Sequence, residues 1–153
     1  MEAEEGRQME SIWGMDGWEE RPSLQKDLSV DTVVIGGGIA WILTAWLLQQ
    51  RGVETVLLEA SRLCGGQTGR TTAKITLQHG LLYQKLMQKE GKEKAGLYGQ
   101  ANRAAIRRYR EIMEEEGIDC QFRNCNSNLY TRKEGDALYL EEEAAKSLGI
   151  CAQ

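Results

Sequence analysis

The chain has 153 residues, of which 41% are hydrophobic and 27% charged, and its formal net charge is -4 at pH 7. This length and composition predict a globular chain with a buried core and exclude an intrinsically disordered one. The negative charge gives no electrostatic basis for binding nucleic acid or an anionic membrane surface, so we expect neither partner.

The N-terminus and the cysteines predict a cytoplasmic protein without a metal site. The first five residues are acidic and contain no apolar signal-peptide core. The most apolar stretch, residues 33–48, contains three glycines and is shorter than the roughly 20 residues that a membrane-spanning helix needs. We expect reduced and mostly buried thiols, because no C-x-x-C pair is present and the chain has one histidine. The cysteines are Cys64, Cys120, Cys125 and Cys151.

The first regular elements form a βαβ pattern after a polar, irregular segment at residues 1–30. β-Branched residues at 31–35 predict a buried parallel strand that ends in three glycines. Residues 39–50 favour a helix with Gly52 as its stop signal, and residues 54–58 predict a second strand. The crossover between these strands should be right-handed.

The rest of the chain does not continue this alternation. Residues 61–80 are rich in glycine and threonine and predict an ordered or functional loop. The remaining elements are expected to be helices at 81–89, 92–116 and 135–148 and short strands at 120–123 and 128–132. An apolar stripe on the long helix should pack against the core. Its members are Ala95, Tyr98, Ala101, Ala105, Tyr109 and Ile112.

The strand, glycine turn and helix near residue 36 predict a dinucleotide site. Gly36 permits a tight turn, and Gly38 leaves room for a pyrophosphate at the positive end of the helix dipole. Glu59 ends the next strand 59 − 36 = 23 residues after Gly36, where a carboxylate accepts hydrogen bonds from a ribose hydroxyl. A carboxylate there disfavours a 2′-phosphate, so FAD or NAD is expected rather than NADP.

Three stretches resemble FAD-dependent oxidoreductases of the glycine and D-amino-acid oxidase (DAO) type: "DTVVIGGGIA", "VLLEASRL" and "GRTTAKITLQHGLLY". The resemblance runs from Ser11 to Ile150. It implies an α/β fold, with a parallel sheet that begins a Rossmann-like FAD-binding domain at residues 31–116, and the start of a substrate domain at 117–153. It also selects FAD over NAD and implies an oxidoreductase that oxidises amines or amino acids by hydride transfer to flavin.

The turn, the second strand end and the following loop together supply the predicted cofactor site. By this resemblance the loop lies close to the pyrophosphate and flavin, and its hydroxyls, Arg70 and Lys74 suit an anionic cofactor. His79 could donate a hydrogen bond near the flavin or cap the following helix. The predicted cofactor-binding residues are Gly36, Gly37, Gly38, Ile39, Ala40, Glu59, Ala60, Ser61, Thr68, Gly69, Arg70, Thr71 and Thr72. No catalytic constellation is assigned.

Two features depart from the family pattern. Trp41 replaces the glycine that lets the helix lie against the strands, which predicts weakened FAD binding or a slightly displaced helix. The chain is also much shorter than such oxidoreductases, so we expect most of the substrate pocket to be missing and apolar sheet edges to be exposed, with poor solubility or pairing with another chain. The alternatives are a non-catalytic nucleotide-binding or interaction module and an NAD-binding domain.

Overall fold

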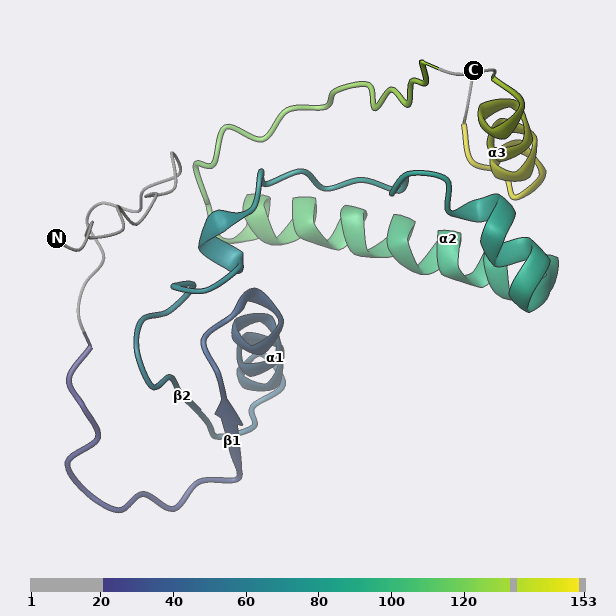
Figure 1. The fold of residues 1–153 in the computed structure, drawn as a ribbon. Helices are drawn as coiled ribbons and strands as arrows, with labels where there is room; N and C mark the ends of the chain where they lie inside the picture. Colours follow the sequence, from purple (N-terminus) through teal and green to yellow (C-terminus); the bar gives the residue numbers. More distant parts are fainter. Residues whose placement is uncertain (1–20, 133–134, 152–153) are drawn as a thin grey trace, which may run out of the picture. The chain divides into compact units, whose positions relative to one another are not determined.

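The computed structural model describes residues 21–132 and 135–151, and the chain divides into two compact units after Ala73. The expected N-terminal segment therefore lies outside the described residues up to position 20, and residues 21–30 form no helix or strand. Figure 1 shows the elements in chain order. Each unit has its own core, so the two are described separately.

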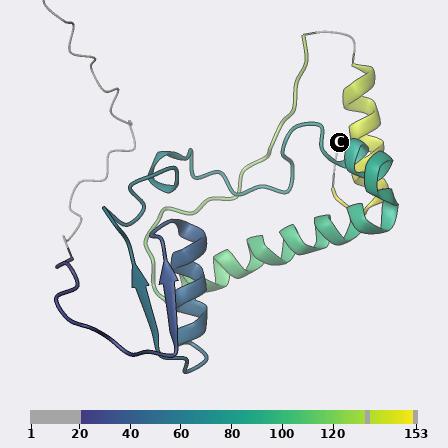
Figure 2. The same ribbon diagram turned by 60° about the horizontal axis from the view of Figure 1, so that its bottom comes forward.

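The first unit contains the predicted βαβ pattern. Strand β1 (Thr32–Ile35) leads into helix α1 (Ile39–Gln49), and strand β2 (Thr55–Leu58) follows. The strands pair in parallel, with Val33 opposite Val56 and Ile35 opposite Leu58. Helix α1 packs against both strands (Figure 2). This two-stranded α/β arrangement corresponds to part of the expected Rossmann-like sheet.

Helix α1 covers one face of the sheet, and the other face is open to solvent. Side chains alternate between the two faces of a strand. Val34 is 6% exposed on the face towards α1, whereas Val33 and Ile35 are 49% and 76% exposed on the opposite face. The face that carries Val33 and Ile35 is therefore apolar and exposed, whereas the exposure of apolar sheet edges stays a prediction.

The second unit is helical. Helix α2 (Tyr83–Glu115) is interrupted at Gly91, whose backbone adopts φ 84° and ψ 163°, so the predicted break between two helices is present. Helix α3 (Asp136–Ser147) packs against α2. The core is formed by Tyr83, Ala144, Ala145 and Ile150, with Leu77, Met87 and Leu148 packed around them. In this core the Tyr83 hydroxyl donates to the Leu77 carbonyl oxygen over 2.8 Å.

Three expectations about secondary structure and burial are wrong. Residues 120–123 and 128–132 form no strand, because no neighbouring strand within the described ranges pairs with their backbone. Of the predicted stripe on α2 only Ala95 is buried, because the core of this unit reaches only the early part of the helix. Three of the four cysteines, all except Cys64, are exposed rather than buried.

Candidate functional site: the glycine turn of the first unit

The turn after β1 places three glycines ahead of helix α1. Gly36 has φ +119°, a conformation that L side chains rarely adopt, and its N–H donates to the Leu58 carbonyl oxygen over 2.7 Å. This bond ties the turn to the end of β2. Helix α1 then begins at Ile39, and Gly38 occupies its N-cap position without a side-chain cap. The turn therefore presents backbone amides at the positive end of a helix, as the sequence predicts.

Glu59 is held directly against this turn. One carboxylate oxygen, Oε2, accepts from the Gly37 N–H over 2.6 Å, and Oε1 accepts from the Ser61 N–H over 2.9 Å. A Cβ on Gly37 would lie only 2.9 Å from Glu59 Cγ, so the close approach requires glycine there. Each carboxylate oxygen can accept a second hydrogen bond, and Glu59 is exposed. The carboxylate is therefore available to a ribose hydroxyl next to the turn.

The segment that follows Glu59 folds back onto the turn. The Cys64 N–H donates to the Gly37 carbonyl oxygen over 2.8 Å, and the Gly69 N–H donates to the Cys64 carbonyl oxygen over 2.9 Å. Thr68 then brings its Oγ1 to the first residue of α1, where it accepts from the Ile39 N–H over 3.1 Å. Thr68 begins the short 3-10 helix η1 (Thr68–Arg70). The glycine turn, the end of β2 and the segment that follows Glu59 are therefore joined by hydrogen bonds.

Sequence reasoning missed the role of Cys64 in this arrangement. Its backbone links the glycine turn to the loop, and its own φ is +55°. Burial raises the pKa of the Cys64 thiol, which favours the neutral form over a reactive thiolate. The pair Gly65-Gly66 directly after Cys64 was the available sign of a tight turn in this segment.

Two amides of the turn remain available for a ligand. Among the described residues, the N–H groups of Gly38 and Ala40 have no hydrogen-bond acceptor. A Cβ placed on Gly38 would lie 3.5 Å from Thr68 Oγ1 and 3.7 Å from Trp41 Cδ1, which are ordinary van der Waals contacts. A side chain as small as a methyl would therefore fit at Gly38. The two donors and the adjacent Glu59 carboxylate fit the diphosphate and ribose of a dinucleotide.

Trp41 lies at the same turn. Its Cδ1, Nε1 and Cγ atoms are 2.7, 2.9 and 3.3 Å from the position that a Cβ on Gly36 would take. The indole is therefore accommodated by the missing side chain of Gly36 and is 51% exposed. The register of β1 and β2 continues up to Ile35 and Leu58 despite the bulky ring.

The other predicted loop residues lie further along the first unit. Arg70, Thr71 and Thr72 are exposed, and within the described part of the chain their side chains make no hydrogen bond to the glycine turn. Thr71 Oγ1 instead accepts from the Ala73 N–H over 3.2 Å. Ala60 and Ser61 follow Glu59 at the surface. Lys74 belongs to the second unit.

Helix α2 is capped by Glu141, a residue that sequence reasoning missed, and not by His79. Glu141 Oε1 accepts from the Leu82 and Tyr83 N–H groups over 2.9 and 2.8 Å, and Oε2 accepts from the Gln84 N–H over 2.9 Å. Burial by itself would raise the pKa of this carboxyl, but its hydrogen bonds, from the Gln84 and Tyr83 amides foremost, lower the pKa below its ordinary value. The chain carries no local signal for a cap that lies almost 60 residues away.

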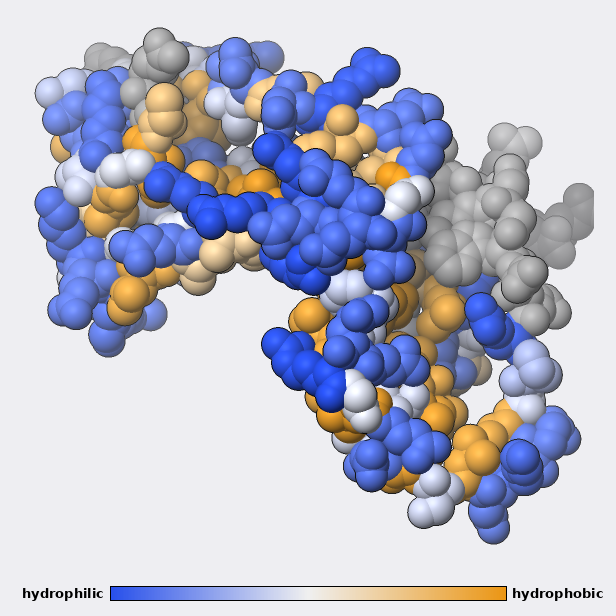
Figure 3. All heavy atoms as spheres, turned by 180° about the vertical axis from the view of Figure 1, so that it is seen from behind, coloured by the Kyte–Doolittle hydropathy of each residue, from blue (hydrophilic) through white to orange (hydrophobic). Residues whose placement is uncertain are grey.

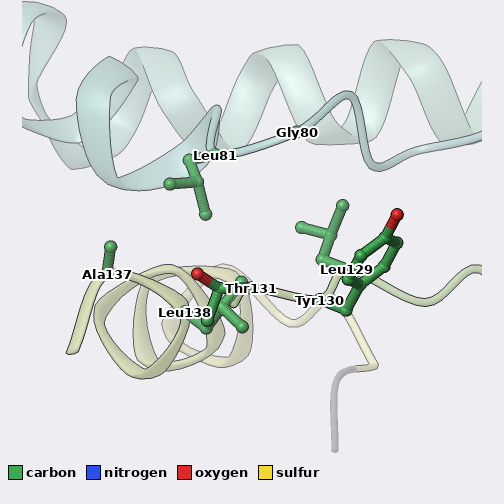
Figure 4. A pocket seen from close by; sticks show the side chains of 7 residues that line it. All are labelled: Gly80, Leu81, Leu129, Tyr130, Thr131, Ala137 and Leu138. Atoms are coloured by element: carbon green, nitrogen blue, oxygen red, sulfur yellow. The ribbon is translucent and has the colours of Figure 1, made fainter. Parts of the chain in front are cut away.

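The second unit also contains a shallow apolar pocket of about 250 Å³. Figure 4 shows that Leu81 points from the segment before α2 towards the residues of α3, with Leu129 and Tyr130 at one side. Tyr130 is itself 83% exposed. No charged side chain lines this pocket, which therefore offers little to orient a ligand.

Residues 21–132 and 135–151 contain neither a metal-ligand cluster nor a helix that could cross a membrane. No group of three or more histidine, cysteine, aspartate or glutamate side chains there could hold a metal ion. The helices in these ranges are all too short or too polar to cross a membrane.

Comparison with known proteins assigns the family of the chain. Residues 31–153 match the family described as "DAO: FAD dependent oxidoreductase". The chain belongs to this family. The match begins just before the glycine turn, so the family assignment includes the whole arrangement around Gly36, Gly38 and Glu59.

Two curated proteins are similar to the chain. It is 40% identical over 131 residues to the "Putative Rieske 2Fe-2S iron-sulfur protein YhfW" of Bacillus subtilis, a match that covers 84% of this chain and 26% of that protein. It is 27% identical over 101 residues to the gamma-glutamylputrescine oxidoreductase of Escherichia coli, with 66% of this chain and 24% of that protein covered. The chain thus spans about a quarter of the length of these relatives. No solved structure matches it.

Proposed function

We propose that the chain binds the ADP part of FAD at its glycine turn and belongs to an oxidoreductase that oxidises a C–N bond of an amine or amino acid. The observation that carries this proposal is the Glu59 carboxylate held 2.6 Å from the Gly37 amide, beside the free amides of Gly38 and Ala40. Membership of a family of FAD dependent oxidoreductases supports FAD over NAD as the ligand. The name of the gamma-glutamylputrescine relative supports an amine as the substrate class.

Each part of the turn has a distinct role in this proposal. The Gly38 and Ala40 amides donate to the diphosphate at the N-terminus of α1, where the helix dipole favours negative charge. Glu59 accepts hydrogen bonds from a ribose hydroxyl. Arg70 adds positive charge on the loop that carries Thr68. When bound, FAD supplies the hydride acceptor, whereas the protein binds and orients it.

The absorption spectrum of the purified chain tests the proposal. We expect visible flavin absorbance after incubation with FAD and removal of the free cofactor, together with a thermal shift in FAD that NAD does not produce. A shift with NAD alone would support an NAD-binding domain instead. If neither nucleotide shifts the melting temperature, the dinucleotide site is refuted and only an interaction role remains.

A second measurement separates an enzyme from a binding module. Anaerobic addition of candidate amines, including gamma-glutamylputrescine, should bleach the flavin absorbance if this chain alone forms a substrate site. A stable yellow colour with every amine would support a non-catalytic FAD-binding module. The chain spans about a quarter of its curated relatives, so the same test should also be made on any longer polypeptide that contains it.

We also propose an iron-sulfur cluster as the electron acceptor, because the relative with 40% identity is named as a Rieske protein. Such a cluster would accept one electron at a time, so two transfers with release of two protons would be needed to reoxidise a reduced flavin held at the glycine turn. No ligand set for such a cluster exists in the described part of this chain, and the cluster would belong to another segment or protein. Faster reoxidation of reduced flavin by ferricyanide than by oxygen is expected, and the reverse order would contradict a one-electron acceptor.

A further inference from the structure

Trp41 contacts the glycine turn from the first turn of helix α1. Its N–H donates to the Gly38 carbonyl oxygen over 3.0 Å, which fixes its backbone at the start of the helix. Its indole lies against Gly36, where Cδ1 and Nε1 are 2.7 and 2.9 Å from the position that a Cβ on this glycine would take. A single residue therefore contacts both the first and the last glycine of the turn.

Gly36 is held by two contacts. Its N–H donates to the Leu58 carbonyl oxygen over 2.7 Å, and the indole of Trp41 occupies the place of its missing side chain. Glycine has more backbone freedom to lose on ordering than any other residue, and three glycines follow one another here. An aromatic ring packed on a glycine compensates for the side chain that the glycine lacks. Without the indole, Gly36 would keep one of its two restraints.

The amides that are available to a ligand lie between these two contacting residues in the chain. The N–H groups of Gly38 and Ala40 have no acceptor within residues 21–132 and 135–151. The contact between Gly36 and Trp41 therefore encloses the segment that carries both donors. Donors that are already held in the binding arrangement do not have to be ordered when the ligand arrives, which increases affinity.

We propose that Trp41 is a positioning residue for the dinucleotide: its indole, packed on Gly36, holds the amides of Gly38 and Ala40 in the arrangement that binds a diphosphate. This inference rests on the proposed function. It reverses the sequence-based expectation that the bulky ring weakens FAD binding. The side chain can take this role because it is 51% exposed, so the contact between helix and strands does not have to accommodate the whole ring.

ADP is the probe for this role, because it contains the diphosphate and ribose but no flavin. We expect Trp41→Ala to bind ADP about tenfold more weakly than the wild type in calorimetry, and Trp41→Phe, which keeps a ring, to stay within about threefold. The control is Leu47→Ala, a half-buried position near the other end of α1. It should lower the melting temperature and leave the ADP affinity unchanged, at a temperature where circular dichroism shows every variant folded.

Amide hydrogen exchange in the ligand-free chain gives an independent readout. In Trp41→Ala the Gly36 N–H should exchange at least about tenfold faster than in the wild type, whereas the Gln50 N–H, which donates to the Trp46 carbonyl oxygen, should not change. Equal or tighter ADP binding by Trp41→Ala, or unchanged exchange at Gly36, would overturn the positioning role and leave FAD binding intact. If the wild type binds neither ADP nor FAD, both this role and the proposed function fail.

Discussion

Gly36 and Gly38 belong to the same turn but differ in whether their position would accept a side chain. Gly36 has φ +119°, and a Cβ there would lie 2.7 Å from Trp41 Cδ1. Gly38 has ordinary backbone angles, with φ -78° and ψ 166°, and room for a Cβ. The fold of the turn therefore requires glycine at position 36, whereas the backbone and the packing at position 38 would accept a methyl group.

Substitution of each glycine by alanine should separate these two requirements. Gly36→Ala should lower the free energy of unfolding of the first unit by about 1–3 kcal/mol, because alanine is strained at a positive φ. Gly38→Ala should leave the unfolding free energy within about 0.5 kcal/mol of the wild type and weaken FAD binding at least about tenfold, because the proposed site brings the diphosphate close to the backbone at this position. Urea denaturation and FAD titration measure the two effects. Undiminished FAD binding by Gly38→Ala would argue against a diphosphate at this amide.

The buried Glu141 carboxylate should make the second unit sensitive to acid. It is 3% exposed and accepts hydrogen bonds from three consecutive amides at the start of α2. Because its pKa in the folded protein is lowered from the ordinary 4.5, the stabilisation is fully present above pH 4.5 and is lost as the pH falls through the folded pKa.

Glu141→Gln should therefore destabilise the second unit by about 1–3 kcal/mol at pH 7, because the amide offers one acceptor oxygen instead of two. The difference from the wild type should shrink as the pH falls below 4.5. Denaturant unfolding across this range measures it. Glu142→Gln, which removes an exposed pair with Lys146, is the control and should change the free energy by less than about 1 kcal/mol. A pH-independent difference would show that the carboxylate charge is not what stabilises α2.

At the scale of whole elements, the interruption of α2 depends on one glycine. Gly91 combines φ 84° with ψ 163°, a region essentially restricted to glycine. Gly91→Ala should destabilise the second unit by about 1–3 kcal/mol or straighten the helix. Gly96→Ala is the control in the same helix, because its Cβ would meet Leu148 Cδ2 at 3.8 Å, and it should stabilise by about 0.5–1 kcal/mol. Thermal unfolding measures both, and equal effects of the two substitutions would contradict a special role for Gly91.

The elements that the sequence predicts well are those with local signals. Helix α1 ends at Gln49 and is followed by Gly52, where the Val53 N–H donates to the Leu48 carbonyl oxygen over 3.1 Å in a Schellman motif, as expected for a glycine after an apolar helix. The strand, turn and strand around Gly36 and Glu59 are equally local, because each lies within about 25 residues of the next. These signals also identify most of the candidate site.

Elements whose structure depends on distant partners were not predictable in this way. Residues 120–123 have the composition of a strand, but a strand forms only where another strand offers its backbone. The cap of α2 comes from Glu141, and the hydrogen bond that joins η1 to the start of α1 comes from Thr68. None of these contacts follows from local propensity, because each joins side chains to backbone that lies elsewhere in the chain.

At the scale of the molecule, the uncovered sheet face should govern behaviour in solution. Two-stranded sheets with one open apolar face are marginally stable alone. Figure 3 shows that hydrophobic residues reach the surface of the chain, and Val33 and Ile35 are among the exposed ones. This surface gives the chain a reason to associate with itself or with a partner that covers β1.

Replacement of Val33 and Ile35 by threonine should reduce association, because threonine keeps the β-branched shape and removes apolar surface. We expect the wild type to elute as a concentration-dependent mixture in size-exclusion chromatography with light scattering, and the double variant to shift at least about twofold towards monomer. Val34→Thr, on the face covered by α1, should instead destabilise the unit. A wild type that is monomeric at every concentration would refute the association.

The long-range contact of Glu141 has a consequence for synthesis on the ribosome. The first amides of α2 are made almost 60 residues before the carboxylate that they bind, and the ribosome adds residues from the N-terminus onwards at about 5–20 per second. During those seconds the first amides of α2 lack the Glu141 carboxylate that they bind in the folded protein. Strands β1 and β2 and helix α1 have by then been synthesised. The order of translation therefore favours completion of the βαβ unit before the helical unit can close.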